Sequence, residues 1–118
     1  MNYDQPYEDF KNAYVRALLQ QEGEQPTERS ILDIAGESYR KIDIDVKRFF
    51  IIAYDLIMKM EGYSFDQAGR DFWRTRNGCS NGFRFKKFGD AGQMLTTIAK
   101  TMGVSEVYLG DDEMIHVR

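Results

Sequence analysis

DVKRFFIIAYDLIMKM, residues 45–60, contains the longest apolar run of the chain and repeats its apolar residues at intervals of three and four. That spacing is typical of one face of an α-helix. The stripe consists of Val46, Phe49, Phe50, Ala53, Ile57 and Met60, and further apolar residues lie off it, among them Ile51, Ile52, Tyr54 and Met58. A helix that is apolar around most of its girth is typically buried. We therefore predict a largely buried central helix that begins at Asp43 or Asp45 and ends near Met60, although its second apolar face could equally be buried in a dimer.

Two more helices are predicted before this one. Residues 5–21 have Pro6 near the first helical position and apolar residues at helical spacing. A polar loop over residues 22–26 follows, and Thr27 or Ser30 can cap a second helix that runs to about Lys41. Residues 1–60 are thus predicted to form three helices.

The second half of the sequence has a mixed pattern. Ser64 and Gln67 have capping-box spacing for a short helix over residues 65–74. After a turn-rich loop at 77–82, residues 83–87 alternate like a strand. A further helix is predicted over residues 90–102, with Gly103 as its end and with Met94, Leu95, Ile98 and Ala99 facing inward. Residues 106–109 and 114–117 resemble two strands around a tight turn, and the 83–87 strand is a candidate third member of their sheet.

The predicted fold class is therefore α+β: a helical part over 1–60, and a part over 61–118 with two helices and a small antiparallel sheet. At 118 residues, the chain has room for one hydrophobic core. We predict a single domain, 1–118, in which both parts share that core.

Several features bear on the compartment. The longest apolar run, residues 49–54, is far shorter than the roughly 20 residues that cross a bilayer. Residues 1–4 lack the basic-then-apolar order of a signal peptide, and Cys79 is the only cysteine, so no internal disulfide can form. We expect a cytoplasmic protein that does not span a membrane.

Basic residues are concentrated in one stretch. Residues 70–88 contain six cations and only Asp71 as an acid, a local charge of +5, which leaves −8 elsewhere because the net charge is −3. Arginines interleaved with aromatic residues suit nucleic acid, because cations neutralise phosphates and rings stack on bases. They equally suit a protein hot spot. We predict an exposed patch that binds a partner and consists of Trp73, Arg74, Arg76, Arg84, Lys86 and Lys87.

A competing interpretation is purely structural. The aromatic residues of this stretch could form the core of the second half, since large aromatic side chains are mostly buried. Asp66, Arg70 and Arg74 are four apart and could pair on a solvated helix face.

Catalytic and metal-binding patterns are weak. Cys79 and His116, with Asp111 or Asp112, are the sole candidates for nucleophilic catalysis, and nothing in the sequence obliges them to meet. One His and one Cys do not predict a metal site, and the sequence has no nucleotide-binding fingerprint. We expect no catalytic residues, no metal and no cofactor.

From about Gln67 the chain resembles a group of small proteins encoded by bacteriophages and mobile elements. The resemblance covers about 50 residues and follows the pattern AGxDFWxTRNG, then GF, then YxGDD, which here spans residues 68–78, 82–83 and 108–112. Similar proteins often have a second Trp and acidic residues after the Gly-Phe pair, where this chain has Arg84, Phe85, Lys86 and Lys87. The resemblance implies a phage origin and a small accessory role.

Three functions remain open at this point. The first is a non-enzymatic inhibitor of a host macromolecular machine, most concretely an anti-CRISPR or anti-restriction protein, docking on a host protein or ribonucleoprotein by the basic patch or by its acidic remainder. The second is a nucleic-acid-binding regulator that uses the basic patch over residues 70–88. The third is an enzyme centred on Cys79. The chain would act as a monomer or a homodimer.

Overall fold

The computed structural model describes residues 3–21, 34–78, 83 and 89–118. These residues contain four helices and a two-stranded antiparallel sheet: α1 (Asp4–Gln21), α2 (Gly36–Met58), α3 (Phe65–Arg76), α4 (Gly89–Thr101), β1 (Val107–Leu109) and β2 (Ile115–Val117). The predicted α+β class is confirmed. None of the described helices is long and apolar enough to cross a membrane.

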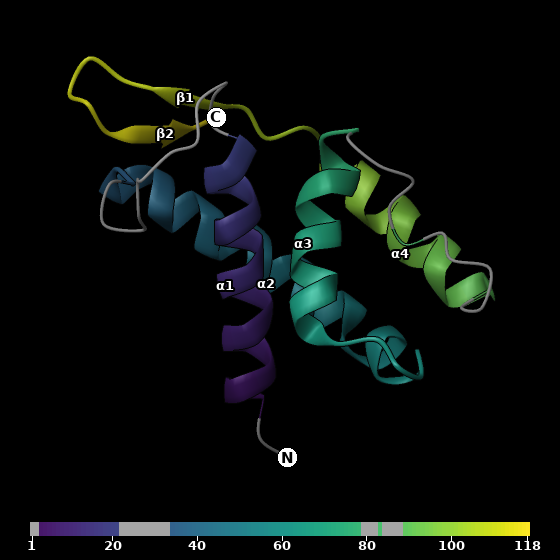
Figure 1. Cartoon of the computed structure of the whole chain (residues 1–118). Helices are drawn as coiled ribbons and strands as arrows, with labels where there is room; N and C mark the ends of the chain where they lie inside the picture. Colours follow the sequence, from purple (N-terminus) through teal and green to yellow (C-terminus); the bar gives the residue numbers. More distant parts are fainter. Residues whose placement is uncertain (1–2, 22–33, 79–82, 84–88) are drawn as a thin grey trace.

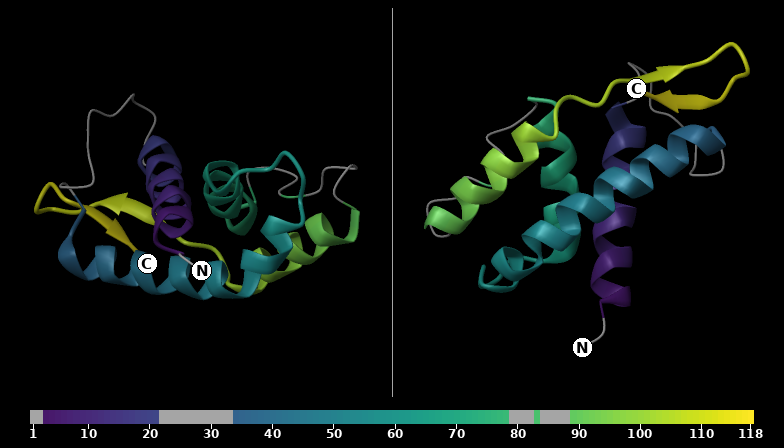
Figure 2. Two further views of the ribbon diagram at one scale, coloured as in Figure 1. Left: turned by 90° about the horizontal axis from the view of Figure 1, so that it is seen from below. Right: turned by 180° about the vertical axis from the view of Figure 1, so that it is seen from behind.

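The helices surround one aromatic core. Figure 1 and the left view of Figure 2 show α1 and α3 side by side on the same side of α2, with α4 beyond α3. The rings of Phe49 in α2 and Phe72 in α3 stack with centroids 4.0 Å apart, and Phe10 in α1 lies 5.7 Å from Phe49. Leu95 in α4 and Ile115 in β2 belong to the same buried cluster. Both halves of the sequence therefore contribute to a single core, as predicted.

The apolar stripe of residues 46–60 is buried, as predicted. The expectation that the chain's own fold buries this helix on most sides is wrong, because Ile51, Ile52 and Met58 are exposed. The other described elements pack against one face of α2 and leave the opposite face open (Figure 2).

The predicted break between a helix ending at Lys41 and another beginning at Asp43 or Asp45 is also wrong. Residues 36–58 form one continuous helix, and Ser38 and Ile42 extend the buried stripe by two turns. Asp43 does not cap a helix; its carboxylate accepts a hydrogen bond of 2.5 Å from the Tyr7 hydroxyl of α1. The predicted helix start at Thr27 or Ser30 falls in residues 22–33, outside the described part of the chain.

The capping box at the start of α3 and the glycine stop after α4 are confirmed, whereas Asp90, a candidate cap for α4, lies in its first turn. Ser64 Oγ accepts from the Gln67 N–H at 3.1 Å, and the Gln67 side chain accepts from the Ser64 N–H at 2.9 Å. Gly103 follows α4 with a φ of 81°, a conformation that favours glycine. Leu95 is buried, but Met94 is exposed rather than inward-facing.

The C-terminal hairpin is confirmed, with Val107 paired to Val117 and Leu109 to Ile115. A lone hairpin is only marginally stable, and this one is fixed to the start of α2. The Ala35 N–H donates to the Ile115 carbonyl, and the Val117 N–H donates to Ser38 Oγ, both at 2.9 Å. The predicted third strand, residues 83–87, lies outside the described residues except for Phe83, which is buried in a turn.

Gly69 sets the close approach of α3 to α1. A Cβ at this position would overlap the Phe10 carbonyl oxygen and lie 3.1 Å from the Ala13 Cβ. We expect Gly69→Ala to lower the free energy of unfolding by about 1 to 3 kcal/mol, as overpacking typically does. Gly36→Ala is the control, because no atom lies within 4 Å of the added Cβ. Urea denaturation of both variants tests this expectation, and equal stabilities would mean that the two helices are not in close contact.

Candidate binding surface

Trp73 lies in the core and not on the surface. Its side chain is 2% exposed, and its ring meets the ring of Tyr14 edge-on, with centroids 5.5 Å apart. Phe72 and Phe83 are fully buried as well. The predicted role of Trp73 in an exposed patch is therefore wrong, and the competing interpretation of these aromatic residues as core is confirmed for Phe72, Trp73 and Phe83.

Arg76 is also buried, so the prediction that it is exposed is wrong. Its side chain is 4% exposed, and Nη1 lies 3.1 Å from Oδ2 of Asp45 in α2. Nη1 also donates to the Tyr14 hydroxyl, while Nε and Nη2 donate to the carbonyls of Gly103 and Met102 at 2.8 and 3.1 Å. Arg76 sits in the last turn of α3, which faces α2 and the end of α4. It therefore connects α3 to α1, to α2 and to the residues that follow α4.

The residues next to Arg76 also have structural roles. Asn77 is the C-cap of α3; its amide nitrogen donates to the Trp73 carbonyl at 3.0 Å, and its amide oxygen accepts from the Ser105 N–H at 2.9 Å. Gly78 has a φ of 71°, which suits glycine. The segment that carries the resemblance thus fixes the end of α3 to the chain after α4.

Asp71 is a buried carboxyl in the same segment. It accepts a hydrogen bond of 2.5 Å from the Tyr63 hydroxyl, and burial raises the pKa of both groups above their usual values. For Asp43, by contrast, the hydrogen bond from Tyr7 lowers the pKa of the carboxyl below its usual value.

These opposite shifts predict opposite pH dependences. A raised pKa means that the folded state binds the proton more tightly, so Asp71 loses stabilising effect as pH rises from 3.8 towards its folded pKa. The free energy of unfolding of Asp71→Asn relative to wild type should therefore rise with pH between 3.8 and the folded pKa of Asp71. Because the pKa of Asp43 is lowered, its contribution to the free energy of unfolding falls as pH drops below 3.8. The stability of Asp43→Asn relative to wild type should therefore rise as the solution is acidified. Urea denaturation at a series of pH values tests both slopes, and slopes of the same sign would contradict this assignment.

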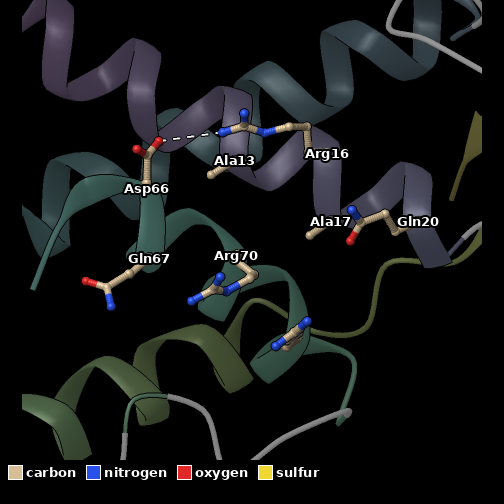
Figure 3. A pocket seen from close by; sticks show the side chains of 8 residues that line it. Ala13, Arg16, Ala17, Gln20, Asp66, Gln67 and Arg70 are labelled. Carbon is tan, nitrogen blue, oxygen red and sulfur yellow. Dashed lines mark ion pairs between the residues drawn. The ribbon is translucent and has the colours of Figure 1, made fainter.

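Three arginines gather between α1 and α3. A pocket of about 330 Å³ opens there, and Ala13, Ala17, Gln20 and Gln67 contribute to its lining together with the charged residues Arg16, Asp66, Arg70 and Arg74. We call this pocket the arginine groove. Figure 3 shows Arg16 on α1 and Asp66 and Arg70 on α3 around it. Small residues on α1 and Gly69 on α3 allow the helices to approach closely, so the longer side chains form the rim.

The charges of the arginine groove are only partly balanced. Arg16 forms an ion pair with Asp66 at 3.6 Å, with both side chains more than half exposed. Arg70 is exposed and Arg74 half-buried, and neither forms an ion pair with another residue of the described part of the chain. Like charges four residues apart slightly destabilise a helix. The charges of Arg70 and Arg74 oppose the burial that raises the pKa of Asp71. No described carboxylate lies within ion-pair distance of either guanidinium group, so an anionic partner would suit the pair.

The sequence did not predict this arrangement fully. It placed Arg74 in a partner-binding patch and paired Arg70 with Asp66, whereas Asp66 pairs across the helices with Arg16. Arg16 is more than 50 positions from Arg70 and Arg74, and only the packing of α1 on α3 brings them together. The remaining predicted site residues, Arg84, Lys86 and Lys87, lie outside the described residues.

Of the candidates for catalysis, the structure brings His116 and Asp112 together. His116 Nε2 lies 3.0 Å from Asp112 Oδ1 within the hairpin, and the His116 ring stacks on Tyr108. Cys79 is outside the described residues. In the part of the chain that is described, no three His, Cys, Asp or Glu side chains are grouped so as to hold a metal ion.

Comparison of the chain with protein-family models, with curated proteins and with solved structures found no match.

Proposed function

We propose that this protein acts by binding a macromolecule through the arginine groove, and not by catalysing a reaction. The convergence of Arg16, Arg70 and Arg74 on one pocket carries the proposal. Arginine is favoured for binding carboxylates and phosphates because its planar fork donates two parallel hydrogen bonds. Arg76 is engaged in the core, so Arg70 and Arg74 are the described basic residues of the 70–88 stretch that reach solvent.

The most concrete form of the proposal is an inhibitor of a host macromolecular machine, such as an anti-CRISPR or other anti-defence protein. The resemblance to phage-encoded accessory proteins supports it, because such a protein needs a stable scaffold and a complementary surface but no catalytic group. In the pattern AGxDFWxTRNG, the two open positions are Arg70 and Arg74. The defined positions lie in the core or at the end of α3, so the open positions are suited to determine the partner. The site of action would be the host cytoplasm, and the partner a host protein or ribonucleoprotein.

A nucleic-acid-binding regulator is the second candidate. The spacing of three arginines along a groove favours it, since cations on one surface can neutralise successive phosphates. Phe72, Trp73 and Phe83 are buried, so their rings are not accessible for stacking on bases. Binding of nucleic acid at the arginine groove would therefore depend on charge.

Titration with labelled single-stranded and duplex DNA and RNA separates the two candidates. Three phosphate contacts should weaken binding to duplex DNA roughly 40-fold, and to single strands roughly 20-fold, between about 50 and about 200 mM salt. The inhibitor proposal predicts no such binding by the protein alone. It further predicts that cells expressing the protein allow a phage targeted by their CRISPR or restriction system to form plaques. Salt-sensitive oligonucleotide binding without any protection of the phage would favour the regulator.

A further inference from the structure

The outer face of α2 carries a row of exposed apolar side chains. Ile44, Ile51, Ile52 and Met58 are 51%, 75%, 56% and 60% exposed. Residues 44, 51 and 58 are separated by seven positions and therefore share one side of the helix. The left view of Figure 2 shows α2 along one edge of the molecule, with α1, α3 and the hairpin all on its other side.

Two exposed opposite charges lie within this row. Arg48 and Asp55 complete the series 44, 48, 51, 55 and 58, which alternates steps of four and three. That alternation is the spacing of a helix–helix seam in a coiled coil. Neither Arg48 nor Asp55 forms an ion pair with another residue in the described part of the chain.

We infer that α2 pairs with α2 of a second copy of the chain in an antiparallel homodimer. The two charges are placed symmetrically about Ile51 and Ile52, so a two-fold axis there sets Arg48 of each copy opposite Asp55 of the other. The same axis sets Ile51 opposite Ile52, and Ile44 near Met58 or Lys59. A parallel arrangement would place Arg48 against Arg48 and Asp55 against Asp55. The antiparallel dimer is self-complementary in both charge and shape, which is what a two-fold interface requires.

A neighbouring hollow supports this choice of interface. A pocket of about 360 Å³ lies beside Ile51 and is lined by Tyr3, Phe50, Ile51, Tyr54 and Asp55. Aromatic residues dominate it, as they do at the centres of protein interfaces. A side chain from the second copy would enter it close to the two-fold axis.

Sedimentation equilibrium over a concentration series tests the dimer directly. The full chain should associate to a dimer, and Ile51→Asp should raise its dissociation constant by at least about tenfold, because a carboxylate would be desolvated at the interface. A wild-type protein that remains monomeric up to about 1 mM, the range of very weak complexes, would overturn the inference. Binding of the monomer to vesicles containing anionic phosphatidylserine would also overturn it, since the face would then be a membrane surface.

Charge exchange tests the antiparallel register. Arg48→Asp and Asp55→Arg should each weaken self-association at least about tenfold. In a dimer of either variant, positions 48 and 55 carry the same charge, and they face each other twice across the two-fold axis. An equimolar mixture of the two variants should form a heterodimer, in which one copy carries two aspartates and the other two arginines. Asp111→Arg, an exposed aspartate of the hairpin turn, is the matched control and should dimerise like wild type.

The outcomes are distinct. Weakened single variants together with a restored mixture support the antiparallel α2 pair. Single variants that dimerise like wild type, or a mixture that fails to restore association, would overturn it. Circular dichroism checks that each variant is folded, which we expect because both residues are exposed.

Discussion

Arg76→Ala is expected to lower the free energy of unfolding by about 3 to 5 kcal/mol, the range for breaking a buried ion pair. The substitution leaves the Asp45 carboxylate, which is 16% exposed, without its counterion. It also removes the donors to the carbonyls of Met102 and Gly103 and to the Tyr14 hydroxyl. Arg76→Lys should recover little, because a single ammonium group cannot reach acceptors on three sides. Urea denaturation measures the difference.

Arg74→Ala is the matched control for this experiment. It lies half a turn earlier in the same helix, faces the arginine groove, and should change the free energy of unfolding by no more than about 0.5 kcal/mol, the usual range for surface positions. Equal effects of the two substitutions would contradict the assignment of Arg76 to the core and Arg74 to the surface.

Phe49→Ala is expected to lower the free energy of unfolding by about 3 to 5 kcal/mol, the range for truncating a buried aromatic residue. Phe49 is fully buried, and its ring stacks on Phe72 and lies 5.8 Å from Phe83. Its removal would leave a cavity between α2, α3 and the chain before α4, which the neighbouring rigid rings could not fill.

Met94→Ala is the control for Phe49→Ala. Met94 is a large apolar residue of α4 that is 53% exposed, so its truncation should change the free energy of unfolding by about 0.5 kcal/mol or less. A large effect at Met94 and a small effect at Phe49 would mean that the core is elsewhere.

Local signals in the sequence predicted most of the secondary structure. The capping box of Ser64 and Gln67, the stop at Gly103 and the strand pair of the hairpin depend on residues that are neighbours in the chain. The aspartates of α2 were misinterpreted for the same reason. Asp43 and Asp45 have the side chains of helix caps. Asp43 instead pairs with Lys47 on the same helix and accepts a hydrogen bond from Tyr7, and Asp45 pairs with Arg76. Tyr7 and Arg76 are distant in sequence and are brought near only by packing.

The candidate site was predicted in part. The neighbouring residues do not distinguish Arg74 from Arg76, since each follows a buried residue, Trp73 or Thr75, near the end of the same helix. Their different roles depend on what faces each side of α3: α1 and solvent at Arg74, and Asp45 of α2 at Arg76. A stronger signal was available in the small residues Ala13, Ala17 and Gly69, whose spacing permits two helices to approach closely and present their longer neighbours together.

The central claim is that the partner binds at the arginine groove. Its most direct test is affinity capture from the proposed host cell by three tagged proteins: wild type, Arg70→Glu/Arg74→Glu, and Arg40→Glu/Lys100→Glu. Arg40→Glu/Lys100→Glu is the control, because it makes the same change of net charge at exposed positions outside the arginine groove. We predict that wild type and Arg40→Glu/Lys100→Glu capture the same partner, and that Arg70→Glu/Arg74→Glu binds it at least about tenfold more weakly, equivalent to about 1.4 kcal/mol. Capture of that partner with unchanged affinity by the folded Arg70→Glu/Arg74→Glu protein would contradict the claim.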